Sequence, residues 1–302
     1  MSPGGATRSW RLRRPLDVGL TFGLLRRGRG DPTMRMFPAG LWRATRTPHG
    51  PACVRLTVHV RDIEFRAWGP GAGWALESAP DFAGEHDDPG ALIARDPIVH
   101  RLLRRLAGLR IGRTGAVLEA VVPAILEQKV TGIEAWRSYR SLVREWGEPA
   151  PGPEGLWLPP DPALLAAKPS WEWHRFGVER RRAEAIRAVS RRSALLEHIL
   201  DLDPPTAYRR LTALPGVGRW TAAEVGGRAL GDPDAVSVGD FHIPHLVTWA
   251  LAGEARGSDA RMLELLEPYR GQRGRVIRLI EAGGLRLPRR APRRALRRIA
   301  SI

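Results

Sequence analysis

Residues 214–221 read Leu-Pro-Gly-Val-Gly-Arg-Trp-Thr and separate two segments, 206–214 and 220–230, whose apolar residues recur with helical spacing. Gly216 and Gly218 allow a tight turn and leave backbone N–H groups uncovered by side chains. A loop that leads into the N-terminus of a helix binds anions, because unpaired N–H groups and the helix dipole both face the ligand. The stretch therefore predicts two helices joined by a hairpin that binds phosphate.

The net charge of the whole chain indicates that this phosphate belongs to a nucleic acid. The 302 residues contain 48 Lys and Arg against 32 Asp and Glu, which gives a formal net charge of +16, and the sequence pI is about 11.4. Such a balance favours binding to nucleic acid. Lys129 and Lys168 are the only lysines, so the positive charge is almost entirely arginine.

Cysteine content and hydropathy exclude several classes. The single cysteine, Cys53, excludes a disulfide framework, a thiolate zinc site and a four-cysteine iron–sulfur cluster. Residues 1–16 lack the apolar stretch of a secretory signal, and no later run approaches the roughly 20 apolar residues of a membrane span. We expect a soluble, cytoplasmic and nucleoid-associated protein with no membrane partner.

The first third of the chain has strand patterns. Val54, Leu56, Val58 and Val60 alternate with polar residues, and shorter candidates lie at 34–45 and 63–68. We predict an antiparallel sheet, hence an α+β fold with a strand-rich N-terminal domain at 1–88. The acidic interval 84–90 marks the boundary. Residues 89–284 form a mainly α-helical domain that carries the hairpin, and 285–302 form a basic tail.

The helical domain is predicted from its period of 3.6 residues. An apolar helix face starts at residue 97, and residues 149–162 form a Pro-rich connector. The other expected helices are 117–130, 134–146, 181–200, 206–214, 220–230, 241–251, 259–269 and 275–282.

The hairpin together with the segment 236–244, Val-Ser-Val-Gly-Asp-Phe-His-Ile-Pro, resembles the helix-hairpin-helix DNA glycosylase superfamily. Asp240 stands where that family has its catalytic aspartate, about twenty residues beyond the hairpin. The resemblance is strongest to the bacterial DNA-3-methyladenine glycosylase II family and covers nearly the whole chain. Segments 15–17, 125–131 and 267–270 also match.

The resemblance implies a monomeric base-excision repair enzyme that flips a damaged nucleotide out of double-stranded DNA and hydrolyses its N-glycosidic bond. Asp240 would stabilise the positive charge that develops on the sugar. Trp220 would stack on an alkylated, cationic purine. Lyase members of the superfamily have a lysine at this position, so tryptophan predicts a monofunctional glycosylase. The implied DNA contacts are Gly216, Val217, Gly218, Arg219, Thr221 and Lys129.

The resemblance also implies a cation site and a base pocket. The carbonyl groups of Thr212, Leu214 and Val217 would hold a monovalent cation, with no other cofactor required. The pocket would contain Trp220, Gln128 and Glu224. Glu224 replaces an aromatic residue of the family, Lys129 a leucine wedge, and Arg278 a tryptophan. The residues leave open which aromatic side chain completes the pocket, and the candidates are Phe22, Trp136, Trp171 and Trp173.

These departures keep two alternatives open. One is a non-catalytic DNA-binding or lesion-sensing protein of the same fold, and the other is a glycosylase for hypoxanthine, uracil or oxidised guanine. Asp240 itself has a structural alternative as the cap of the following helix. Trp220 could likewise be part of the helix core. Asp232 and Asp234 are nearby rivals for the catalytic role, although they read more simply as a turn.

Overall fold

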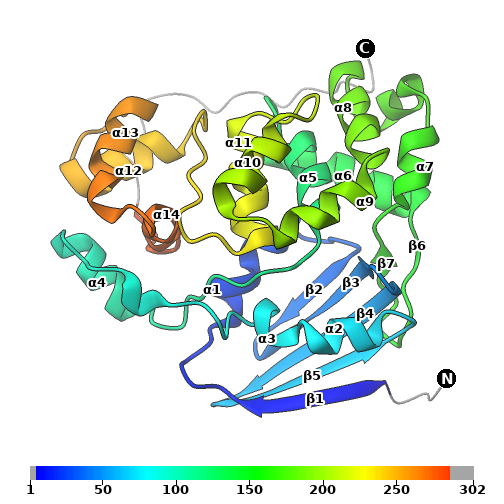
Figure 1. Ribbon diagram of the computed structural model, residues 1–302, viewed down its shortest axis with the longest axis horizontal. Helices are drawn as coiled ribbons and strands as arrows, with labels where there is room; N and C mark the ends of the chain where they lie inside the picture. Colours follow the sequence, from blue (N-terminus) through cyan, green and yellow to red (C-terminus); the bar gives the residue numbers. More distant parts are fainter. Residues whose placement is uncertain (1–4, 286–302) are drawn as a thin grey trace.

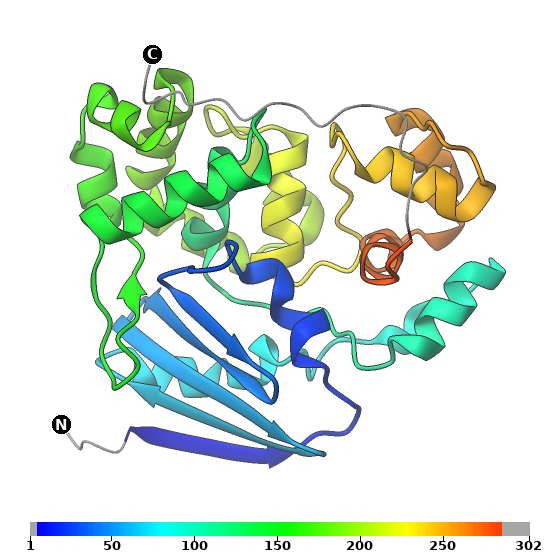
Figure 2. The ribbon, with the colours of Figure 1, turned by 180° about the vertical axis from the view of Figure 1, so that it is seen from behind.

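The N-terminal part of the chain is built on one antiparallel sheet. The computed structural model describes residues 5–285. Its first sheet has the strand order β1-β5-β4-β3-β2 (Figures 1 and 2). The strands are β1 (Ala6–Arg11), β2 (Met34–Phe37), β3 (Gly40–Thr47), β4 (Gly50–His59) and β5 (Asp62–Trp68). The predicted antiparallel, strand-rich beginning is thereby confirmed.

Two details of the sheet differ from the prediction. The segment 34–45 is not one strand, because the chain turns between Phe37 and Gly40 and the two halves pair as β2 and β3. Strand β1 was not predicted. It lies at the edge of the sheet against β5 and its side chains are mostly exposed, so its sequence has no alternation of apolar and polar residues.

Short helices cover one face of this sheet. Helices α1 (Val18–Phe22), α2 (Ala72–Glu77) and α3 (Ala79–Phe82) pack with the strands around a buried core that includes Leu41, Leu56 and Phe65. The rings of Phe22 and Phe82 stack with their centroids 4.8 Å apart. The N-terminal part is therefore a layer of strands under a layer of short helices (Figure 1).

The remainder is helical, as predicted. The longer helices are α4 (Pro97–Arg105), α5 (Val117–Leu126), α6 (Gly132–Trp146), α7 (Pro162–Ala167), α8 (Arg180–Ser190), α9 (Ser193–Glu197), α10 (Pro204–Thr212), α11 (Arg219–Val225), α12 (Ile243–Ala252), α13 (Asp259–Leu266) and α14 (Arg273–Ala282). Short 3₁₀ turns are η1 (Gly23–Leu25), η2 (Pro89–Ala91), η3 (Ser170–Phe176), η4 (His198–Asp201) and η6 (Glu267–Tyr269), and α11 continues as a π-helical turn, η5 (Gly226–Leu230).

Most predicted helix boundaries are shifted by one to four residues, and the expected helix 117–130 ends at Leu126. Three differences are larger or have a structural cause. The expected helix 181–200 is divided into α8, α9 and η4. The expected helix 241–251 begins only at Ile243, because the Asp240 carboxylate accepts the amides of the helix start and leaves Phe241 78% exposed outside it. The connector 149–162 contains a small second sheet of β6 (Glu148–Pro149) and β7 (Trp157–Leu158).

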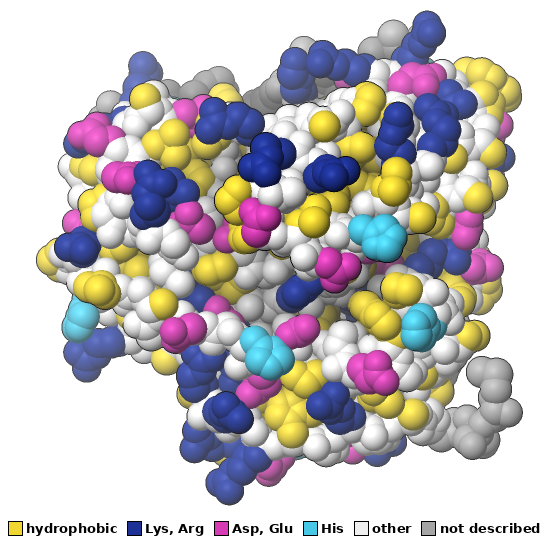
Figure 3. All heavy atoms as spheres, viewed as in Figure 1, with side chains coloured by type: hydrophobic (Ala, Val, Ile, Leu, Met, Phe, Trp, Pro, Cys, Tyr) yellow, Lys and Arg dark blue, Asp and Glu magenta, His cyan; other side chains and the backbone are white. Residues whose placement is uncertain are grey.

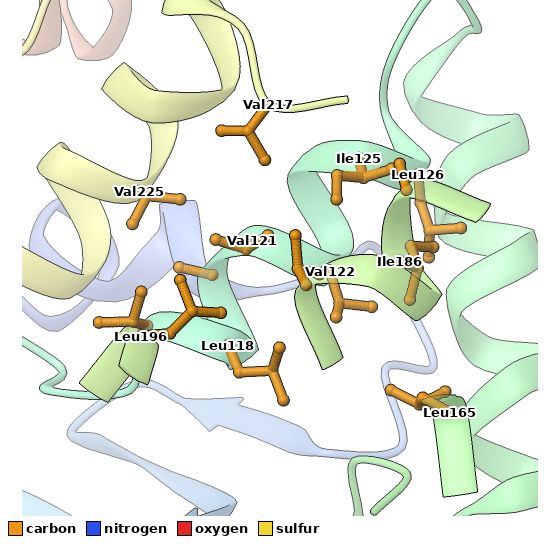
Figure 4. Packing of buried hydrophobic residues seen from close by; sticks show 14 of the residues in the cluster. Leu118, Val121, Val122, Ile125, Leu126, Leu165, Ile186, Leu196, Val217 and Val225 are labelled. Carbon is orange, nitrogen blue, oxygen red and sulfur yellow. The ribbon is translucent and has the colours of Figure 1, made fainter. Parts of the chain in front are cut away.

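The helices form two groups with separate buried cores. One surrounds the apolar helix α5, whose side chains contact α6, α8 and α11 (Figure 4). The other joins α4 with α12, α13 and α14. In Figures 1 and 2 the second group lies to one side of the first, and the chain between η5 and α12 runs from one to the other. That linking segment contains Asp240.

Buried ion pairs cross the predicted domain boundary at residue 88. Arg275 of α14 is 1% exposed and pairs with Asp87, whose second carboxylate oxygen accepts the Ile111 amide at 3.0 Å. Removing one partner of a buried pair leaves an uncompensated charge, so this contact holds α14 against the N-terminal part. No helix among residues 5–285 is long and apolar enough to cross a membrane. The predicted tail, apart from Leu285, lies outside the described residues.

Candidate active site

The hairpin between α10 and α11 has the expected geometry at one of its two glycines. Gly216 has φ +80°, and a Cβ atom there would come within 2.4 Å of the Ala185 Cβ of α8. Gly218 has an ordinary extended conformation, with φ −92°, and its Cβ position is open. Glycine is therefore required at 216 by both the backbone and the packing, whereas residue 218 accepts a side chain.

The hairpin leaves two of its three central amides free. The N–H groups of Gly216 and Gly218 have no hydrogen-bond partner within residues 5–285, whereas the Val217 amide donates to the Leu214 carbonyl at 3.1 Å. The Val217 side chain is buried and directed toward the apolar residues of α5 (Figure 4). Val217 therefore fixes the hairpin on the core, and its amide is not available to a phosphate.

Gln128 and Thr221, which were both predicted at the site, form hydrogen bonds behind the hairpin. The Gln128 amide nitrogen donates to the Gly216 carbonyl at 2.8 Å and to the Thr221 hydroxyl at 2.9 Å. Thr221 is only 1% exposed. Its side chain is therefore directed into the protein and supports the hairpin from inside. Gln128, expected in the base pocket, instead ties the end of α5 to the hairpin.

Lys129 and Arg219 lie on the outside of the same region. Lys129 follows Gln128 in the turn between α5 and α6, is exposed, and has φ +58°. A left-handed conformation at a residue other than glycine costs about 1–3 kcal/mol and occurs most often at functional sites. Arg219 is exposed at the first residue of α11. Figure 3 shows Lys and Arg side chains gathered along the upper part of the molecule, over the region of α8 to α11.

Asp240 is held by both of its carboxylate oxygens. Oδ2 accepts the indole N–H of Trp220 at 2.9 Å, and Oδ1 accepts the amides of His242 and Ile243 at 2.7 and 2.9 Å. The side chain is half-buried. Asp240 therefore does cap the start of α12, and the same bonds place its charge directly against α11, just after the hairpin.

Two further contacts hold the loop that carries Asp240. The Gly239 amide donates to both carboxylate oxygens of Asp259, at 3.1 Å each, and Gly239 has φ +92°. The Ser237 hydroxyl donates to Glu224 Oε1 at 2.6 Å. Since Trp220 and Glu224 are four residues apart on one face of α11, this helix holds the loop at two points.

Trp220 is not part of a core. It is half-buried and belongs to none of the buried clusters, and its indole nitrogen is committed to Asp240. The rival carboxylates have other partners. Asp232 accepts the Tyr208 hydroxyl at 2.6 Å, and Asp234 pairs with Arg273 of α14. Asp240 is thus the carboxylate that this arrangement brings to the hairpin.

A cavity of about 130 Å³ adjoins the Asp240 loop. Its wall includes Ser237 and Ile243 on either side of Asp240, Glu224 of α11, and residues of α1 and α14. Glu224 also pairs with Arg228 one helical turn further on. The charged residues of the lining are Arg110, Glu224, Arg228, Asp232, Arg278 and Glu281. The cavity is therefore polar where the family pattern would supply aromatic rings.

The charges of this cavity compensate one another. Burial is the largest single influence on the pKa of Arg228 and lowers it, but the carboxylates of Glu224, Glu127 and Glu281 together outweigh burial, so that the pKa is raised and the guanidinium stays charged. Burial raises the pKa of Glu281. The Arg228 guanidinium also donates to the Leu24 carbonyl of η1, at 3.4 Å, and thereby connects α11 with the N-terminal part.

Of the four candidate aromatic residues, only Phe22 borders the cavity, and it is almost fully buried. Trp173 is completely buried, with its ring 5.0 Å from that of Trp146, and Trp171 is 75% exposed. Trp136 packs beside Gly28. These three tryptophans do not line the cavity.

Sequence reasoning missed Arg228, Ser237 and Asp259. Arg228 could have been found, because it follows Glu224 at the spacing of a helical ion pair. The role of Asp259 has no local signal, since its partner Gly239 lies twenty residues earlier.

The hairpin carbonyls fit the predicted monovalent cation in part. The carbonyl of Leu214 already accepts the Val217 amide, but a carbonyl oxygen has a second lone pair. The three carbonyl groups of Thr212, Leu214 and Val217 belong to one turn, so their chemistry suits such an ion.

The fold of this chain is similar to that of solved DNA glycosylase structures. The 3-methyladenine DNA glycosylase of Archaeoglobus fulgidus superposes with a TM-score of 0.78 over 91% of this chain and 97% of its own, at 19% identity. The fold is that of a DNA glycosylase. The 8-oxoguanine glycosylase/lyase of Clostridium acetobutylicum, solved with double-stranded DNA, has a TM-score of 0.69 at 13% identity and covers 92% of this chain and 97% of its own.

A curated protein matches about half of this chain in sequence. A probable bifunctional transcriptional activator/DNA repair enzyme AlkA of Mycobacterium tuberculosis is 32% identical over 161 residues, which are 51% of this chain and 32% of that protein. The match thus spans about a third of the relative's length. No family model matches the chain.

Proposed function

We propose that this protein is a monofunctional DNA glycosylase that hydrolyses the N-glycosidic bond of alkylated purines during base excision repair. The observation that carries the proposal is the position of the Asp240 carboxylate, which accepts hydrogen bonds from the Trp220 indole and from the start of α12. Its loop borders a cavity, and Trp220 belongs to the helix that follows the hairpin. The A. fulgidus structure is named as a 3-methyladenine DNA glycosylase and the M. tuberculosis relative as a DNA repair enzyme, and both names support the proposal.

Binding would begin at the hairpin. The free amides of Gly216 and Gly218 and the Arg219 guanidinium offer donors to backbone phosphates of the duplex. Flipping a nucleotide out of the stack costs a few kcal/mol, which these contacts and the net positive charge of the chain would supply. Lys129, exposed beside the hairpin, would fill the space left in the duplex.

Chemistry would follow at Asp240. Departure of the base leaves oxocarbenium-like positive charge on the deoxyribose, and a fixed carboxylate stabilises that charge and orients the attacking water. The Trp220 and α12 donors keep the carboxylate in place before the reaction, so little reorganisation is needed. An alkylated purine carries positive charge and leaves as a neutral base, which requires no general acid.

The products should be a free base and an intact strand with an abasic site. Trp220 occupies the place of a lyase lysine and has no amine with which to form a Schiff base. We expect borohydride to trap no covalent complex with lesion-containing DNA, as judged on denaturing gels. A trapped complex that disappears in a Lys129→Arg variant would contradict the monofunctional assignment.

A specific observation favours a second candidate, a glycosylase for hypoxanthine, uracil or oxidised guanine. The cavity beside Asp240 is lined by Glu224, Arg228, Arg278 and Glu281, which suits recognition of a neutral base by hydrogen bonds. The test uses duplexes that each carry one defined lesion, with alkaline cleavage to reveal abasic sites. The alkylated duplex should be the best substrate. A faster reaction on one of the other lesions would favour the second candidate.

Arg219 should contribute to binding without reading the sequence. In Arg219→Gln, we expect affinity to fall equally for duplexes of different sequence, and the slope of log affinity against log salt to become shallower by about 1. Arg61, which is exposed on the distant turn after β4, provides a matched Arg→Gln control. A loss that depended on sequence would show that Arg219 does not contact phosphate.

The proposed partner is double-stranded DNA, bound by a monomer in the bacterial nucleoid. A monovalent cation on the hairpin carbonyls would support the phosphate site, and no other cofactor is required by the proposed reaction.

A further inference from the structure

A second, larger cavity lies away from Asp240. It has a volume of about 630 Å³, within the roughly 300–1,000 Å³ range of small-molecule sites. Its walls come from the turn after β3, from α2, from α5 and α6, and from α7, α9 and η4. None of its lining residues lines the cavity beside Asp240. It therefore forms a separate space between the sheet and the helical part.

The walls of this cavity are mainly apolar. Leu118 and Val122 of α5, Leu142 and Val143 of α6, and Leu165 of α7 face it, and Figure 4 shows the three from α5 and α7 among the packed side chains around α5. Burial of apolar ligand surface against such walls contributes roughly 25 cal/mol per Å². The cavity therefore suits a ring system or another apolar group.

Glu197 of α9 is a half-buried acidic side chain of this wall that has no cationic partner among the described residues. Its two carboxylate oxygens accept the amides of Val117 and Leu118, each at 3.2 Å, at the start of α5. No cationic side chain within residues 5–285 pairs with it. Burial raises the pKa of this carboxyl group, in keeping with the missing counter-charge.

Asp201 of η4 also borders the cavity but is exposed to solvent, and two further charged residues of the wall have partners. Glu119 pairs with Arg43 at 2.6 Å and accepts the Thr45 hydroxyl at 2.9 Å. Arg46 pairs with Glu148 at 2.7 Å and donates to the Pro159 carbonyl at 2.8 Å. A ligand that enters would therefore meet the half-buried Glu197 carboxylate, which has no cationic partner, beside apolar walls.

We propose that this cavity is a binding site for an apolar organic cation, whose ammonium group pairs with Glu197 while its rings lie against Leu118, Val122 and Leu142. A charge-assisted hydrogen bond in such a setting contributes roughly 10- to 100-fold in affinity. The site would be independent of the proposed glycosylase reaction, because its residues belong to neither the hairpin nor the Asp240 loop.

The test compares two probes of the same shape on the full-length protein by titration calorimetry. Naphthylmethylamine should bind at least about tenfold more tightly than the uncharged naphthylmethanol. In Glu197→Gln, which keeps an oxygen acceptor for the α5 amides, the two affinities should become equal. In Val122→Phe, which fills the cavity, both probes should lose binding.

Glu224→Gln is the matched control, because it makes the same change in the other cavity and should leave amine binding unchanged. The proposal is overturned when neither probe binds, when the alcohol binds as well as the amine to the unmodified protein, or when Glu224→Gln rather than Glu197→Gln abolishes the preference. The comparison of probes on the unmodified protein stands even where a variant does not fold.

Discussion

Replacing Asp240 with asparagine should lower the single-turnover rate of base release by about 100-fold or more, while duplex affinity changes by less than about threefold. The loss follows from the charge, because removal of one fixed electrostatic contact to a transition state typically costs about 100- to 1,000-fold. Asparagine retains an oxygen that can accept the Trp220 indole N–H or the α12 amides, so the loop should keep its shape.

The control for this substitution is Asp62→Asn, an identical change at an exposed position of β5. It should have no effect on base release. A second comparison separates charge from position, because Asp259→Asn weakens the contact with Gly239 and should lower the rate less than Asp240→Asn does. Turnover that survives in Asp240→Asn would assign the chemistry to another group.

Replacing Gly216 with alanine should destabilise the fold by about 2 kcal/mol or more, as measured by urea denaturation. Alanine at φ +80° is strained, and its methyl group would overlap the Ala185 side chain of α8. Movement of the hairpin would also disturb the Gly216 carbonyl that accepts from Gln128. We therefore expect weaker binding to duplexes of every sequence.

Gly218→Ala provides the matched comparison within the same loop. Its backbone is extended and the space around its Cβ is open, so the free energy of unfolding should change by no more than about 0.5 kcal/mol. Equal destabilisation by the two substitutions would contradict the assignment of Gly216 as the residue on which the hairpin depends.

The elements that could be predicted are those with one buried face, because their apolar residues recur at the spacing of a strand or a helix. The alternation of residues 54–60 predicted β4, and the apolar spacing after residue 97 predicted the helical part. Strand β1 could not be predicted, because an exposed edge strand is stabilised by backbone pairing with β5 rather than by its side chains. The break of 181–200 into α8, α9 and η4 likewise has no periodic signal.

For the candidate site too, the sequence predicted some residues, whereas other contacts depend on how distant segments pack. The hairpin was predicted from its residue types and spacing, and Asp240 from the resemblance of residues 236–244 to the glycosylase superfamily. The Trp220 to Asp240 hydrogen bond brings the two together. The burial of the Thr221 side chain could not be predicted, because a residue after a hairpin can face either solvent or the core, and only the packing of α11 on α5 decides. The Glu224 to Ser237 contact depends on how the linking segment folds back, which no local pattern reports.

The most direct test of the proposed activity is chromatography of the free bases released when the purified protein acts on methylated genomic DNA. We expect 3-methyladenine or 7-methylguanine to appear with the unmodified protein and to be absent with Asp240→Asn. Release of no free base from this DNA, or from duplexes containing hypoxanthine, uracil or oxidised guanine, would contradict a glycosylase and favour a non-catalytic DNA-binding protein of the same fold.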